Sequence, residues 1–138
     1  MSNELIFKSK AFFESITYDV NSDSYYFLFN EKISLTVTGF WRILIENKIN
    51  IVSLDNGQQF GHPKPINLIE ITTKLLKDKK LKEIKINKET ADLTLTFSNN
   101  IILEIYISSS GYETYSLSLK EKRYLGLGSG EIGIMKSN

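Results

Sequence analysis

His62 is the only histidine of the 138-residue chain, and it lies in the segment FGHPKP between Gly61 and Pro63. Because an imidazole titrates near neutral pH, His62 could act as a general base or as a pH-dependent switch. The sequence offers no cysteine and no second histidine to complete a zinc site with it. Prolines and glycines on both sides of His62 are typical of a loop with a defined path, so a structural role is the alternative.

Serine, glycine and carboxylate side chains gather in two later segments. GLGSGE, residues 126–131, has the glycines of a phosphate-binding loop, but it lacks the Lys-Ser/Thr ending, and no helix is predicted after it. SSSGYETYSL, residues 108–117, offers serine hydroxyls, yet only His62 could activate one as a nucleophile. Carboxylates such as Glu104 could meet others near strand ends, although no spacing rule requires it. We therefore predict no catalytic residue, cofactor or metal site, and a protein that is not an enzyme.

The segment 108–117 itself has two interpretations. Gly111 can supply a turn, and the serines before it can cap strand ends. Tyr112, Glu113 and Tyr115 then either brace a corner of the sheet or project as a contact patch.

Alternating apolar and polar residues predict strands through the first half of the chain. Ile33, Leu35 and Val37 alternate with hydroxyl residues, as in a strand that buries one face. Polar turn residues separate most of these segments. The sequence therefore predicts a β meander over residues 5–55, and its strands are expected at 12–20, 25–30, 32–39, 40–47 and 49–55.

One helix is predicted after a loop at residues 56–66. Asn67 can cap it, and Glu70 follows at the spacing of a capping box. An apolar stripe that includes Leu68, Ile71 and Leu75 continues the pattern, so the helix is expected over residues 67–80. Hairpins follow over residues 81–136. The order of strands, helix and strands predicts a single domain of the α+β class, with a mostly antiparallel, bent sheet and one main helix packed on a face.

Composition limits the partners that we expect. The net charge is +1, with the basic residues concentrated in the middle of the chain. The lysine-rich stretch 74–89 has no arginine and no aromatic for stacking on bases, so we predict no nucleic-acid partner. The N-terminal residues lack the basic start and the sustained apolar run of a secretory signal. No apolar run in the sequence is long enough to cross a bilayer. With cysteine absent, we expect a cytoplasmic protein without a membrane partner.

Four motifs resemble a family of small, mostly uncharacterised bacterial proteins, some of them associated with polymorphic toxin loci as immunity proteins. They cover about two-thirds of the chain. They are a D-x-G-x-x-F-G-x-P-x-P segment (residues 55–65), a D-L-T-L-x-F strand (92–97), an S-S-G-Y-E patch (109–113) followed by Tyr115, and a closing G-x-G-E (128–131).

The resemblance implies a non-catalytic protein that neutralises a cognate bacterial toxin by covering its active site or an essential surface. Such a protein needs no catalytic residues of its own. We expect a monomer or weak homodimer, in which the candidate partner-binding residues are Tyr112, Glu113, Tyr115, Glu131 and His62. Two alternatives remain, a structural homo-oligomer that pairs edge strands and a small enzyme that uses His62 with loop carboxylates.

Overall fold

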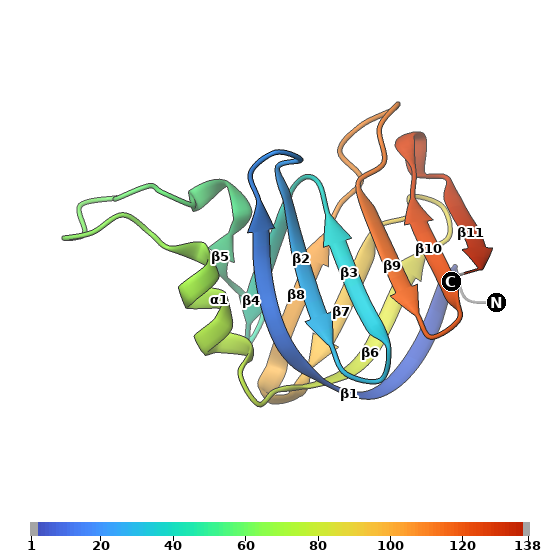
Figure 1. The fold of residues 1–138 in the computed structure, drawn as a ribbon, viewed down its shortest axis with the longest axis horizontal. Coiled ribbons are helices and arrows are strands. Elements are labelled where there is room, and N and C mark those ends of the chain that lie inside the picture. The colour runs from blue at the N-terminus through green and yellow to red at the C-terminus, as the bar shows by residue number, and fades with distance from the viewer. Residues whose placement is uncertain (1–2, 137–138) are drawn as a thin grey trace.

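The computed structural model describes residues 3–136, which form eleven β-strands, one α-helix and three short 3-10 helices (Figure 1). The strands are β1 (Glu4–Asp19), β2 (Ser24–Phe29), β3 (Ile33–Val37), β4 (Trp41–Ile45), β5 (Lys48–Val52), β6 (Lys80–Asn87), β7 (Leu93–Phe97), β8 (Ile101–Ile105), β9 (Tyr115–Leu119), β10 (Lys122–Gly126) and β11 (Ile132–Lys136). The helices are η1 (Ser53–Asp55), α1 (Leu68–Leu76), η2 (Ser98–Asn100) and η3 (Gly128–Gly130).

The strands form one antiparallel sheet that folds over on itself at β1. Their order is β11-β10-β9-β3-β2-β1-β6-β7-β8-β4-β5. The first part of β1 pairs with β6 and its last part with β2, and the register shifts between Lys8 and Ala11 and again between Phe13 and Ser15. Such irregularities bend a strand. Figure 1 shows β1 sweeping under the molecule from the back layer, with β4 to β8, to the front layer, with β2, β3 and β9 to β11.

The core lies between these two layers. Trp41 of the back layer is fully buried, and its ring centroid lies 5.2 Å from those of Tyr25 and Phe27 in the front layer. Phe29 and Phe97 make a second contact between the layers at 6.0 Å. Because strand side chains alternate between faces, every second residue of β3 enters this core, as its sequence pattern predicts.

The predicted α+β class is wrong, because the structure is 52% strand and 13% helical and is therefore nearly all β. Asn67 caps α1 as predicted, and its side chain accepts a hydrogen bond from the Glu70 amide at 3.1 Å. The helix ends at Leu76, short of the predicted residue 80, because Lys77 has a non-helical ψ of 129° and Asp78 has a φ of 61°. Lys80, the last residue of the predicted helix, is the first residue of β6. The helix contacts β1 and lies at the flank of the two layers (Figure 1).

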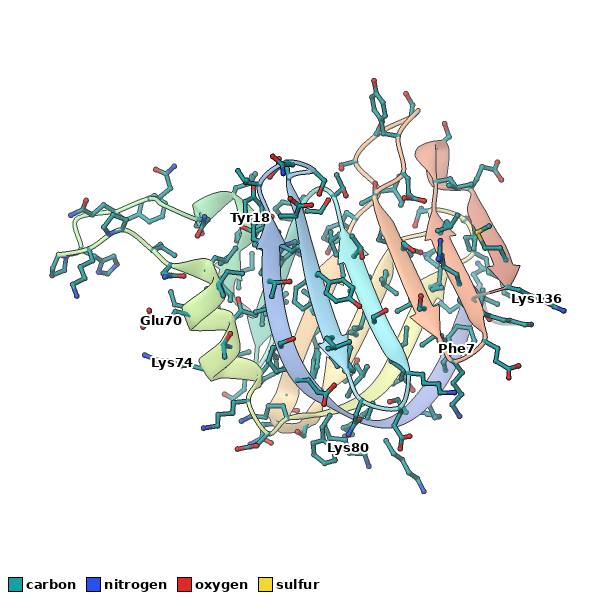
Figure 2. The ribbon with its side chains drawn as sticks, in the orientation of Figure 1. Phe7, Tyr18, Glu70, Lys74, Lys80 and Lys136 are labelled. Atoms are coloured by element: carbon teal, nitrogen blue, oxygen red, sulfur yellow. The ribbon has the colours of Figure 1, made fainter. Side chains whose placement is uncertain are left out.

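The strand directions divide the connections between two ends of the molecule. The loop end holds residues 19–23, 38–40, 53–67, 88–92, 106–114 and 127–131, and the contact of Tyr25 with Trp41 joins the layers there. The turn end holds residues 30–32, 46–47, 77–79, 98–100 and 120–121 together with the β1 bend at 8–12, and the contact of Phe29 with Phe97 joins the layers there. Figure 2 shows Tyr18 toward the loop end and Lys80 at the turn end.

Candidate functional site

The two ends carry opposite charge. In the described part of the chain, the loop end has seven acidic residues (Asp19, Asp23, Asp55, Glu89, Asp92, Glu113 and Glu131) and two basic ones (Lys64 and Lys88). The turn end and the strand residues next to it have eleven lysines (8, 10, 32, 48, 77, 79, 80, 82, 120, 122 and 136) and five acidic residues (31, 46, 78, 83 and 121). The net charge of +1 therefore conceals a strongly polarised surface.

Residues 56–66 project from the loop end as a hairpin-like finger (Figure 1). At its base, the amide of Gly57 donates to the carbonyl of Ile66 at 2.8 Å, and the amide of Ile66 donates to the carbonyl of Gln58 at 2.7 Å. Near its tip, the amide of His62 donates to the carbonyl of Gln59 at 2.7 Å, and the Gln59 side chain donates back to the carbonyl of His62. Internal hydrogen bonds thus give the finger a defined shape outside the packed layers.

Phe60 at the tip of the finger belongs to the 55–65 motif but was not among the candidate partner-binding residues. Its side chain is 65% exposed, although it is large and apolar. Its φ of 43° is uncommon for an aromatic residue and costs of the order of 1 to 3 kcal/mol. Strained residues of this kind cluster at ligand-contact sites. The sequence does contain a sign of this exposed side chain, because Phe60 lies between Gln59 and Gly61 inside a predicted loop.

His62 lies on the same finger and is exposed to solvent. Within residues 3–136, the imidazole has no hydrogen bond or ion pair with a carboxylate. The finger and the 108–114 loop stand at opposite sides of the loop end in Figure 1, so the serines of that loop lie away from His62. His62 is therefore a surface residue of the finger, close to Phe60 in the sequence. In the described structure its imidazole lacks the hydrogen-bonded carboxylate that would orient it as a general base.

The 108–114 loop and the GLGSGE segment pack directly against each other. The amide of Ser129 donates to the carbonyl of Ser109 at 3.0 Å. A Cβ at Gly128 would lie 2.6 Å from the backbone of the 108–114 loop, and a Cβ at Gly130 would lie 2.8 Å from the Thr90 carbonyl oxygen. Glycine is therefore required at both positions for close approach. These glycines hold three loops together, which explains the motif without a bound phosphate.

Tyr112, Glu113 and Glu131 are exposed on this group of loops. The hydroxyl oxygen of Ser109 accepts hydrogen bonds from the amides of Gly111 and Tyr112, at 3.0 and 2.9 Å, and so shapes the turn. The Tyr112 side chain is 81% exposed beyond it. Three of the five candidate partner-binding residues therefore lie on one part of the loop end.

Tyr115, another of the five candidates, is buried with 1% of its surface exposed. Its hydroxyl donates to the Ala91 carbonyl at 2.8 Å, and burial raises the pKa of the phenol above its usual value. Its ring lies 2.2 Å from where a Cβ of Gly126 would be, so only glycine leaves room for it. Tyr115 braces the sheet corner and offers no surface to a partner, whereas Tyr112 projects.

Some carboxylates of the loop end also shape their own loops. Asp19 accepts hydrogen bonds from the Asn21 amide and the Ser22 hydroxyl, both at 3.0 Å. Asp23 accepts a hydrogen bond from the Tyr18 hydroxyl, which raises the pKa of Tyr18 to about 12. These hydrogen bonds fix the β1–β2 turn.

No family model, no curated protein and no solved structure matches this chain. The family resemblance drawn from the four motifs therefore stays a prediction. Among residues 3–136, no three His, Asp or Glu side chains are grouped so that they could hold a metal ion. The same part of the chain contains no helix with the length and apolar character needed to cross a lipid bilayer.

Proposed function

We propose that the protein is a non-catalytic binding protein whose loop end contacts a basic surface of another protein. The observation that carries this proposal is the joint presence of clustered carboxylates and two highly exposed aromatic side chains, Phe60 and Tyr112, at one end of a rigid sheet. Exposed aromatics serve as anchors in protein interfaces, and surrounding charge steers and orients the partner. Loops on a rigid scaffold are the usual place for such contacts.

The more specific proposal is an immunity protein that acts in the bacterial cytoplasm and covers the active site or an essential surface of a cognate toxin. The four motifs support this role through the family that they resemble. A near-neutral chain is a poor match for a toxin with a basic active site, such as a nuclease. The seven acidic residues of the loop end remove this objection, because charge complementarity depends on the contacting surface.

Co-expression tests this function. The product of the adjacent upstream reading frame is induced in a bacterial host with and without this protein, and the pair is examined by size exclusion. We expect the neighbour to arrest growth alone, and this protein to restore growth and to co-elute with it. Phe60→Ser combined with Tyr112→Ser should abolish rescue. Phe12→Ser, at a 44% exposed aromatic of the turn end, is the matched control and should rescue normally. A harmless neighbour with no complex would contradict the immunity role.

A homo-oligomer is a second candidate, because the described sheet ends in two edge strands, β5 and β11, with exposed apolar residues at Ile49 and Ile134. An unpaired edge can add a strand from another copy. Light scattering of the isolated protein tests this candidate, which requires a mass of at least two chains that decreases on dilution. A constant mass of one chain would exclude it.

A further inference from the structure

A slot of about 400 Å³ opens at the turn end beside the β1 bend. Both layers of the sheet contribute to its walls. The ring centroids of Phe7 and Tyr124, one from each layer, lie 5.1 Å apart. The apolar lining residues are Ile6, Phe7, Ile33, Ile84, Leu119 and Tyr124. A mostly apolar concavity of this volume is within the range of small-molecule sites.

Lysines surround this apolar lining. Lys8, Lys120 and Lys122 line the slot itself. An adjoining groove of about 600 Å³ adds Lys10, Lys80 and Lys82. Figure 2 shows Lys80 and Phe7 toward this end of the molecule.

Most of these ammonium groups lack a carboxylate partner. Lys8 pairs with Glu83, which also pairs with Lys85 at 3.4 Å. Within residues 3–136, no ion pair is formed by the remaining lysines of the slot and of the adjoining groove, which are Lys10, Lys80, Lys82, Lys120 and Lys122. Six lysines line the slot and the groove, and the only carboxylates among the same lining residues are those of Glu31 and Glu83. The excess like charges repel one another, and a bound anion would relieve that repulsion.

We propose that the slot binds a small amphipathic anion, such as a fatty acid. Its apolar body would lie against Phe7 and Tyr124, and its carboxylate or phosphate head group would contact Lys120 and Lys122. The combination of apolar walls with unpaired lysines carries this assignment. A simple inorganic anion would leave the apolar lining unused. The residues that line the slot include no arginine and no exposed aromatic side chain on which a base could stack, so a nucleic acid is a poor fit.

This site is independent of the proposed toxin-binding function. The slot opens at the turn end, and the proposed partner surface is at the loop end. A ligand in the slot leaves that partner surface free. Failure of either proposal therefore does not affect the other.

Calorimetry with the isolated full chain tests the slot directly. Laurate is the probe, with dodecyltrimethylammonium and dodecanol as cationic and uncharged probes of equal chain length. We expect saturable binding of one laurate per chain, and binding of the other two probes weaker by roughly tenfold or more. Lys120→Gln combined with Lys122→Gln should weaken laurate binding by a similar factor. Lys74→Gln combined with Lys77→Gln, which removes two exposed lysines in and just after α1, should leave it unchanged.

Ile6→Trp provides a second test that does not involve charge. Ile6 is 47% exposed at the slot, so a larger side chain can fill the slot without entering the core. We expect this variant to lose laurate binding while circular dichroism and thermal unfolding stay as in the wild type. The proposal is overturned by absent binding in folded protein, by equal binding of the cationic probe, or by laurate binding that both slot variants retain. Tighter binding of inorganic phosphate, an oligothymidylate, a polyglutamate peptide or phosphatidylglycerol vesicles than of laurate would also overturn it.

Discussion

The loop end and the turn end are built from the same strands but differ in both backbone and charge. The turn end joins its strands mainly through short turns and carries an excess of lysines. The loop end carries the longer connections, including the finger and the 108–114 loop, and an excess of carboxylates. The two-layered sheet thus presents an acidic surface at one end and a basic surface at the other. The net charge of the whole chain reveals neither surface, because the two charges nearly cancel.

The arrangement of acidic residues at the loop end depends on the close packing of its loops against one another. Gly128→Ala should disturb that packing, because its Cβ would lie 2.6 Å from the backbone of the 108–114 loop. We expect the free energy of unfolding to fall by about 1 to 3 kcal/mol, measured by chemical denaturation.

Gly111→Ala is the matched control in the neighbouring loop. A Cβ at Gly111 would meet no atom within 4 Å, so its substitution should change stability by about 0.5 kcal/mol or less. Equal stability of the two variants would show that the close approach at Gly128 does not hold the loops together.

A smaller effect should appear in the titration of Tyr18. Its hydrogen bond to Asp23 favours the neutral phenol and raises the pKa from about 10 to about 12. The resulting stabilisation is fully present below pH 10 and is lost as the pH rises through about 12. Asp23→Asn should lower the Tyr18 pKa toward 10, measured by absorbance titration against Tyr18→Phe. An unchanged titration would mean that Asp23 does not act on this phenol.

Local features of the fold could be predicted from the sequence, because they depend on neighbouring residues. The alternation through β3 and the cap at Asn67 both appear in the structure. The end of α1 could not be predicted, because the apolar and lysine pattern continues beyond Leu76 while the backbone at Lys77 and Asp78 leaves the helix. The α+β prediction was wrong because it gave a main structural role to this helix, which has only nine residues beside an eleven-stranded sheet.

The candidate site was less predictable, because it depends on contacts between distant segments. The acidic residues of the loop end come from five separate connections, and only the strand order places them together. Tyr112 and Tyr115 are three residues apart, yet one is exposed and the other is buried against Gly126. Composition alone does not distinguish a bracing tyrosine from a projecting one.

The central claim is that the loop end is the partner surface, and reversing charge at each end tests it most directly. Glu113→Lys combined with Glu131→Lys, and Lys82→Glu combined with Lys120→Glu, alter the net charge by equal amounts in opposite directions, at exposed positions of opposite ends. Growth rescue in the co-expression assay and co-elution with the neighbouring gene product are the readouts. We expect the loop-end variant to lose both and the turn-end variant to keep both. A loop-end variant that rescues as well as the wild type, while the turn-end variant fails, would contradict the account.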